Sequence, residues 1–147
     1  MIVRDAVTIE APVERVWEVF TDVERWPEWT PSVTTATVIA GDGVAPGTRV
    51  RMKQPRLPEM TWEVTRVEPG STWTWVSRSP GAVTKAVHHV RALDGSTTRV
   101  ELVIEQTGML GALVGRLMRG MTRRYLAMEA AGLKHRCEAG SSGAATA

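Results

Sequence analysis

The chain has 147 residues, of which 43% are hydrophobic and 23% are charged, and its formal net charge is +2 at pH 7. These values are typical of one globular domain, and they argue against a disordered chain and against a nucleic-acid binder, which usually carries a clustered basic footprint. No apolar run is long enough to span a membrane and no basic and apolar leader opens the chain, so we expect a cytoplasmic protein without integral membrane association.

The first predicted elements are a strand and two short helices. Residues 2–10 alternate loosely and are rich in β-branched side chains, which favours a strand that Ala11 and Pro12 then end. Residues 12–20 place apolar side chains at helical spacing, with Pro12 suited to the first helical position. A second short helix is predicted over 22–26, before Pro27.

Six further strands follow, and most are separated by turn residues such as Gly-Asp-Gly, Pro-Gly and Asp-Gly. Their predicted ranges are 33–40, 47–54, 60–68, 72–78, 82–93 and 97–106. Strands joined by short turns imply an antiparallel sheet, seven strands in all when the first is included.

The C-terminal part changes to a helical period. Apolar side chains from Leu110 to Met128 recur at spacings of three and four, which predicts one long helix over 109–136. Residues 139–147 have no periodicity, and we expect a disordered tail after a single domain of residues 1–138. The predicted fold class is α+β, with the seven-stranded sheet wrapped around the long helix.

The segment VTIEAPVERVWEVFTDVERWPEWTPSV (7–33) resembles the opening of the START-like or SRPBCC superfamily. The resemblance rests on a strand followed by Ala-Pro, a helix with a Val-Trp pair, an Asp, and a Trp-x-x-Trp-x-Pro segment. It extends over about residues 3–136 through later strands and the long helix. It implies a helix-grip fold like that of polyketide cyclase/dehydrase-type proteins and the birch-pollen allergens, with an apolar cavity between sheet and helix.

Alternation along the strands and the stripe on the long helix predict which side chains face that cavity. The candidate ligand-binding residues are Met52, Met60, Trp62, Trp73, Trp75, His88, Leu102, Leu117, Met118, Met121 and Tyr125. A wall of Trp and Met side chains either fills a core or accepts an irregular apolar molecule.

Few polar groups share this inner face. His88 is predicted inside and its neighbour His89 outside, and the imidazole suits either a ligand contact or proton transfer near neutral pH. The Tyr125 hydroxyl needs a partner if it is buried, and Gln54 and Gln106 lie on the inner side at strand ends. Cyclases of the family often place Arg and Tyr in the cavity, whereas no Arg here is clearly inside.

Three functions therefore stay open. The first is binding of a small hydrophobic molecule that is lipid-, aromatic- or polyketide-like, and the second is a polyketide aromatase/cyclase-type reaction in the same cavity. The third is an interaction module with a collapsed core, using the basic stripe of Arg116, Arg119, Arg123 and Arg124 on the long helix. We expect no metal and no cofactor, because one cysteine (Cys137) and three histidines without a CxxC pair make no structural zinc site. A homodimer is compatible with the sequence.

Overall fold

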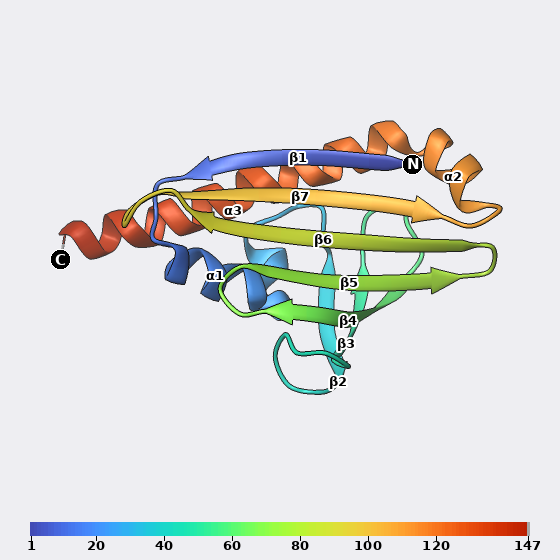
Figure 1. Ribbon diagram of the computed structural model, residues 1–147, viewed down its shortest axis with the longest axis horizontal. Helices are drawn as coiled ribbons and strands as arrows, with labels where there is room; N and C mark the ends of the chain where they lie inside the picture. Colours follow the sequence, from blue (N-terminus) through green and yellow to red (C-terminus); the bar gives the residue numbers. More distant parts are fainter. Residues whose placement is uncertain (147) are drawn as a thin grey trace.

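The computed structural model describes the backbone of residues 1–146 and the side chains of residues 1–139. One antiparallel sheet dominates it, in the strand order β1-β7-β6-β5-β4-β3-β2. The strands are β1 (Ile2–Ile9), β2 (Thr35–Ala40), β3 (Arg49–Lys53), β4 (Met60–Glu68), β5 (Thr72–Ser79), β6 (Ala82–Ala92) and β7 (Thr98–Thr107). Because β1 pairs with β7, the first and last strands lie side by side at one end of the sheet (Figure 1).

Two short helices follow β1, as the sequence predicted. Helix α1 spans Val13–Thr21, and η1, a 3₁₀-helix, spans Val23–Glu28 with Pro27 inside it. Pro12 caps α1 rather than opening it, which is a difference of one residue. The Trp26 indole N–H donates to the Phe20 carbonyl over 3.0 Å, so the two short helices are fixed against each other.

The C-terminal part is long and helical, but it is two helices instead of the single one predicted. Helix α2 covers Gly111–Leu117 and α3 covers Arg119–Thr146, with a break at Met118. Glycines at 115 and 120 flank the break, and glycine is a poor helix former. Helix α3 continues to Thr146, ten residues beyond the predicted end at 136, so it includes most of the segment that was expected to be a tail. The domain boundary at residue 138 stays a prediction.

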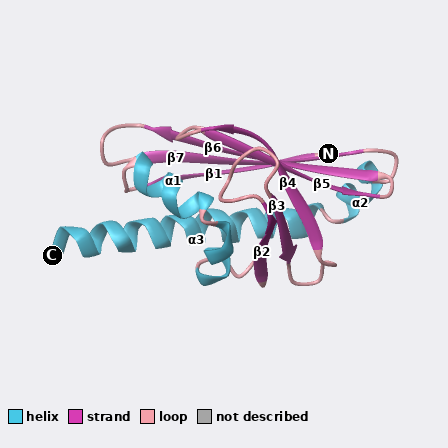
Figure 2. Cartoon of the chain, turned by 90° about the horizontal axis from the view of Figure 1, so that it is seen from below, coloured by secondary structure: helices cyan, strands magenta, loops and turns pink. Residues whose placement is uncertain are grey.

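Helix α3 lies along one face of the sheet, and strands β2 and β3 curl toward it (Figure 2). The core lies between them, where apolar side chains of the inner sheet face such as Val50, Trp62 and Leu102 are buried. Val50, Val64 and Val100, which strand alternation places on the inner side together with Met52, Trp62 and Leu102, are fully buried.

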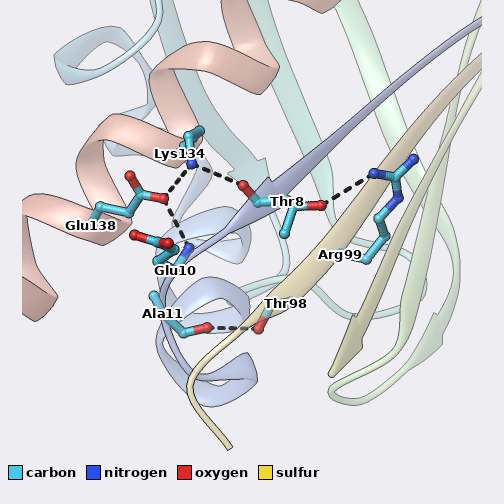
Figure 3. Close-up of polar contacts among 7 residues, drawn as sticks. All are labelled: Thr8, Glu10, Ala11, Thr98, Arg99, Lys134 and Glu138. Carbon is cyan, nitrogen blue, oxygen red and sulfur yellow. Dashed lines mark hydrogen bonds and ion pairs between the residues drawn. The ribbon is translucent and has the colours of Figure 1, made fainter. Parts of the chain in front are cut away.

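Polar contacts fix the C-terminal half of α3 to β1 (Figure 3). The Lys134 ammonium donates to the Thr8 carbonyl over 3.0 Å and to the Glu138 carboxylate over 2.5 Å. The same carboxylate accepts the Glu10 backbone N–H over 2.9 Å. The helix is therefore held at the edge of the sheet opposite to β2. None of the described helices is both long and apolar enough to cross a bilayer.

Candidate functional site: a cavity between the sheet and the C-terminal helices

A cavity of about 450 Å³ lies between the inner face of the sheet and helices α2 and α3. Its volume falls within the range of about 300–1,000 Å³ that is usual for small-molecule sites. The core is therefore not collapsed, which contradicts the third predicted function, an interaction module with a collapsed core.

Nine of the eleven predicted binding residues line this cavity: Met52, Met60, Trp62, Trp75, His88, Leu102, Met118, Met121 and Tyr125. Gln54 and Gln106, expected at its mouth, line it as well. The sheet supplies a floor of indole and thioether groups, and α3 supplies the opposite wall. The strand alternation and the helical stripe thus placed nine of the eleven predicted residues correctly, although the lining also includes many residues that were not predicted. Whether these residues bind a ligand stays a prediction.

Trp73 and Leu117 differ from the prediction. Trp73 is completely buried and does not line the cavity, because its ring stacks on His88 with 3.8 Å between ring centroids. Leu117 is 77% exposed, because α2 packs on the sheet through Gly111 and Gly115 and its leucines lie on another side. Leu110, which was also expected to face inward, is 52% exposed for the same reason.

His88 lies in the middle of β6 and is 3% exposed. Its Nδ1 is 3.0 Å from the Trp73 carbonyl, which can only accept, so Nδ1 carries the proton and Nε2 is left as an acceptor. Burial lowers the pKa of His88 to about 3, against a smaller opposing effect of the Trp73 carbonyl. The imidazole is therefore neutral throughout the physiological range. His89 is exposed, as predicted, and bonds Thr72 on the outer face.

Glu129 is a cavity residue that the sequence analysis did not identify. It projects from α3 and its side chain is 13% exposed. Burial raises its pKa to about 8, so the carboxyl group is mostly protonated at pH 7. Its spacing could have revealed it, because Glu129 is four residues after Tyr125 and eight after Met121, on the same face of the helix.

The side chains of Glu129 on α3 and His88 on β6 meet at the cavity wall, with Glu129 Oε1 3.9 Å from His88 Nε2. This distance is too long for a hydrogen bond, and Oε1 has no other partner among the described residues. Since burial disfavours both charged forms, the proton resides on the carboxyl group and the pair is neutral. One cavity wall thus holds a proton donor and a proton acceptor in an otherwise apolar setting.

Tyr125 finds its partner in the backbone. Its hydroxyl donates to the Pro55 carbonyl, in the loop between β3 and β4. This contact fixes the loop against α3, so that Leu57 and Pro58 close one side of the cavity. The hydroxyl is thereby occupied, which weakens the prediction that Tyr125 contacts a ligand through it.

Polar groups at the opening were also missed. Arg78 and Glu59 line the cavity and are exposed, although alternation placed no arginine clearly inside. Arg78 lies at the end of β5, where a side chain reaches the rim irrespective of the strand face. Two polar atoms of the lining residues, Gln106 Oε1 and Trp62 Nε1, are buried without a partner among the described residues. Unpaired buried polar atoms are costly, and they favour an occupant that has polar groups of its own.

A curved antiparallel sheet that grips a long C-terminal helix over an internal cavity defines the helix-grip class of START-like proteins. The family described as polyketide cyclase/dehydrase and lipid transport matches residues 1–138, and the chain belongs to this family.

The chain is similar to a putative polyketide cyclase of Streptomyces halstedii, with 27% identity over 104 residues, or 69% of this chain and 84% of that protein. Its fold is similar to the crystal structure of the Zhui aromatase/cyclase from Streptomyces sp. R1128, with a TM-score of 0.77 and 17% identity. That match covers 94% of this chain and 93% of the other. A START superfamily protein from Mycobacterium smegmatis aligns with a TM-score of 0.73 and 18% identity, over 93% and 97% of the two chains.

Proposed function

We propose that this protein binds a small hydrophobic molecule, aromatic or polyketide-like, in the cavity between the sheet and α3. The observation that carries the proposal is the cavity of about 450 Å³, which has indole and thioether walls and a neutral polar pair. No described cationic side chain other than Arg78 at the rim lines it, so the deep end suits an uncharged group better than an anion. A cytoplasmic location is part of this proposal.

The test uses 1-naphthol as the probe and isothermal titration calorimetry as the measurement. Met121→Trp places a larger side chain in the cavity, and we expect it to weaken 1-naphthol binding at least about tenfold by taking up ligand space. Met128→Trp is the matched control, because Met128 lies on the same helix and does not line the cavity. Equal affinity in the wild type and both variants would refute binding in this cavity.

A second candidate function is a cyclisation or dehydration of the polyketide cyclase type. The observation that favours it is the neutral pair, because Glu129 offers a proton to a carbonyl or hydroxyl oxygen and His88 Nε2 accepts one. General acid–base groups contribute about 10²–10⁴ in rate. The relatives that match in sequence are named putative polyketide cyclases, which gives the same indication.

Glu129→Gln separates the two functions. Glutamine keeps the shape of the side chain and removes the acid. A binder should keep its affinity for 1-naphthol within about threefold, whereas an enzyme should lose about 100-fold or more in its rate with a soluble β-polyketone. No turnover in the wild type with such substrates, together with intact binding, would favour the binding function.

A further inference from the structure

Helix α2 has an unusual distribution of side chains. Its two buried residues are Gly111 and Gly115, while Leu113 is 57% and Leu117 is 77% exposed. Gly111 packs over Ala82, and a Cβ at Gly115 would lie 2.5 Å from Gln106 Oε1. The helix therefore sits on the sheet through its smallest residues and presents its largest ones to the outside.

The exposed apolar side chains form one patch. Besides the two leucines it contains Met109 (94% exposed), Leu110 (52%) and Val114 (40%). Positions 110, 113, 114 and 117 are spaced by three and four, so they share one side of the helix. We call these five residues the α2 patch. Leu and Met are normally among the most buried residue types, and a contiguous exposed group of them marks an interaction surface.

Four arginines lie within α2 or in the first two turns of α3, directly after it in the chain. Arg116, Arg119, Arg123 and Arg124 are all exposed, and none forms an ion pair with another described residue. The chain has no Asp or Glu from residue 106 to residue 128, so nothing along this stretch neutralises the four guanidinium groups. The two features together are typical of a helix that lies in the plane of a membrane interface.

The patch also adjoins the cavity. Val114 belongs to the patch and lines the cavity, and Met118, directly after α2, lines it as well. Helix α2 lies at the end of the molecule, beside the β5–β6 turn and the N-terminus of β1 (Figure 1). A surface that covered the patch would therefore lie next to one wall of the cavity.

We propose that the α2 patch and its four arginines dock on the surface of an anionic lipid bilayer. The leucine and methionine side chains enter the acyl boundary, and the guanidinium groups meet lipid phosphates and carboxylates. Docking holds the cavity wall at the interface where hydrophobic molecules are dissolved. The proposal goes beyond binding in the cavity and does not depend on which molecule is bound.

Two other occupants fit the observations less well. A second copy of the chain would meet this surface across a two-fold axis and would bring the same four arginines face to face. A stable protein interface buries about 800 Å² on each partner, whereas α2 has only seven residues and ends at the break. A lipid surface needs neither a matching shape nor a large rigid area.

The test is flotation of the full chain with vesicles of phosphatidylcholine alone or with 30% phosphatidylserine, at low and high salt. Wild type should float with the anionic vesicles and lose most of its binding in 0.5 M NaCl. Leu117→Glu should weaken the binding about tenfold or more, and Arg→Gln at residues 119, 123 and 124 together should weaken it about 100-fold, or roughly fivefold for each charge.

Two controls carry the same chemical changes elsewhere. Arg91 is exposed near the end of β6, and Leu93, which is 49% exposed, directly follows that strand. Both lie at the end of β6 that is far from α2. Leu93→Glu and Arg91→Gln should float as the wild type does. Circular dichroism would verify that each variant is folded, as expected for substitutions at exposed positions.

Three results would overturn the proposal. One is the absence of flotation with anionic vesicles at low salt. Another is equal loss of binding in the α2 variants and in the controls. The third is a concentration-dependent dimer, detected by light scattering, that Leu117→Glu abolishes while vesicle binding is unchanged, because the patch would then be an interface between copies.

Discussion

Glu129 makes the stability of this protein depend on pH in a way that one substitution should remove. Its pKa is about 8 in the folded chain and 4.5 in its ordinary setting, because burial disfavours the carboxylate. Between these two values the folded state holds a proton that the unfolded state has released, so folding stability falls as the pH rises. The fall is about 1.4 kcal/mol for each pH unit.

His88 acts in the opposite direction over a different range. Its pKa is about 3 when folded and 6.5 in its ordinary setting, so its contribution makes stability rise with pH between those values. The two effects oppose each other from about pH 4.5 to 6.5, and the wild type should be most stable on that plateau. From pH 6.5 to 8 only Glu129 titrates, and we expect the free energy of unfolding to drop by about 2 kcal/mol.

Glu129→Gln should abolish this drop, so that the free energy of unfolding is flat above pH 6.5. The assay is urea unfolding of both proteins at half-unit intervals from pH 5 to 8.5, followed by tryptophan fluorescence. Glu101→Gln is the control, because Glu101 is an exposed carboxylate on β7 and its loss should leave the drop in place. Parallel curves for the wild type and Glu129→Gln between pH 6.5 and 8 would show that the carboxyl group is not held protonated in the fold.

Three further substitutions test how α3 is placed. A Cβ at Gly132 would overlap the carbonyl oxygen of Trp29, so Gly132→Ala should lower the free energy of unfolding by about 2 kcal/mol or more. Gly120→Ala is the control, because a Cβ there meets no neighbouring atom within 4 Å, and it should raise the free energy of unfolding by about 0.5–1 kcal/mol. A similar effect of both substitutions in urea unfolding would refute the close approach of Gly132 to Trp29. Tyr125→Phe removes the bond to the Pro55 carbonyl and should cost about 1 kcal/mol; unchanged stability in the same assay would mean that the bond contributes nothing.

The strands and the apolar sheet side of the cavity could be predicted from the sequence, because side chains alternate along a strand with a period of two. Met52, Trp62 and Leu102 were placed correctly by that rule alone. The element order and the resemblance then gave the architecture.

The helical part was harder to predict for two physical reasons. An apolar stripe was assumed to face the sheet, whereas in α2 the glycines pack inward and Leu113 and Leu117 are exposed. A periodic pattern gives the spacing of side chains but not which side of the helix is covered. Glu129 was missed because the inward stripe of the helix was assigned from apolar residues alone, whereas burial keeps the carboxyl group of Glu129 protonated.

The buried contacts of α3 are unevenly distributed along its length, and local opening of the helix should follow this distribution. Among the described side chains of α3, the buried ones are Leu126, Ala130, Leu133 and Cys137, and Lys134, which bonds the Thr8 carbonyl of β1, lies in the same stretch. The first turns of α3 and the whole of α2 contribute only glycines to the buried interior. Local opening free energies follow burial of this kind, so we expect amide exchange to be slower over residues 126–137 than in α2 and the first turns of α3. Local opening of α2 would then uncover the cavity wall that Val114 and Met118 form, while the sheet and residues 126–137 keep their native packing.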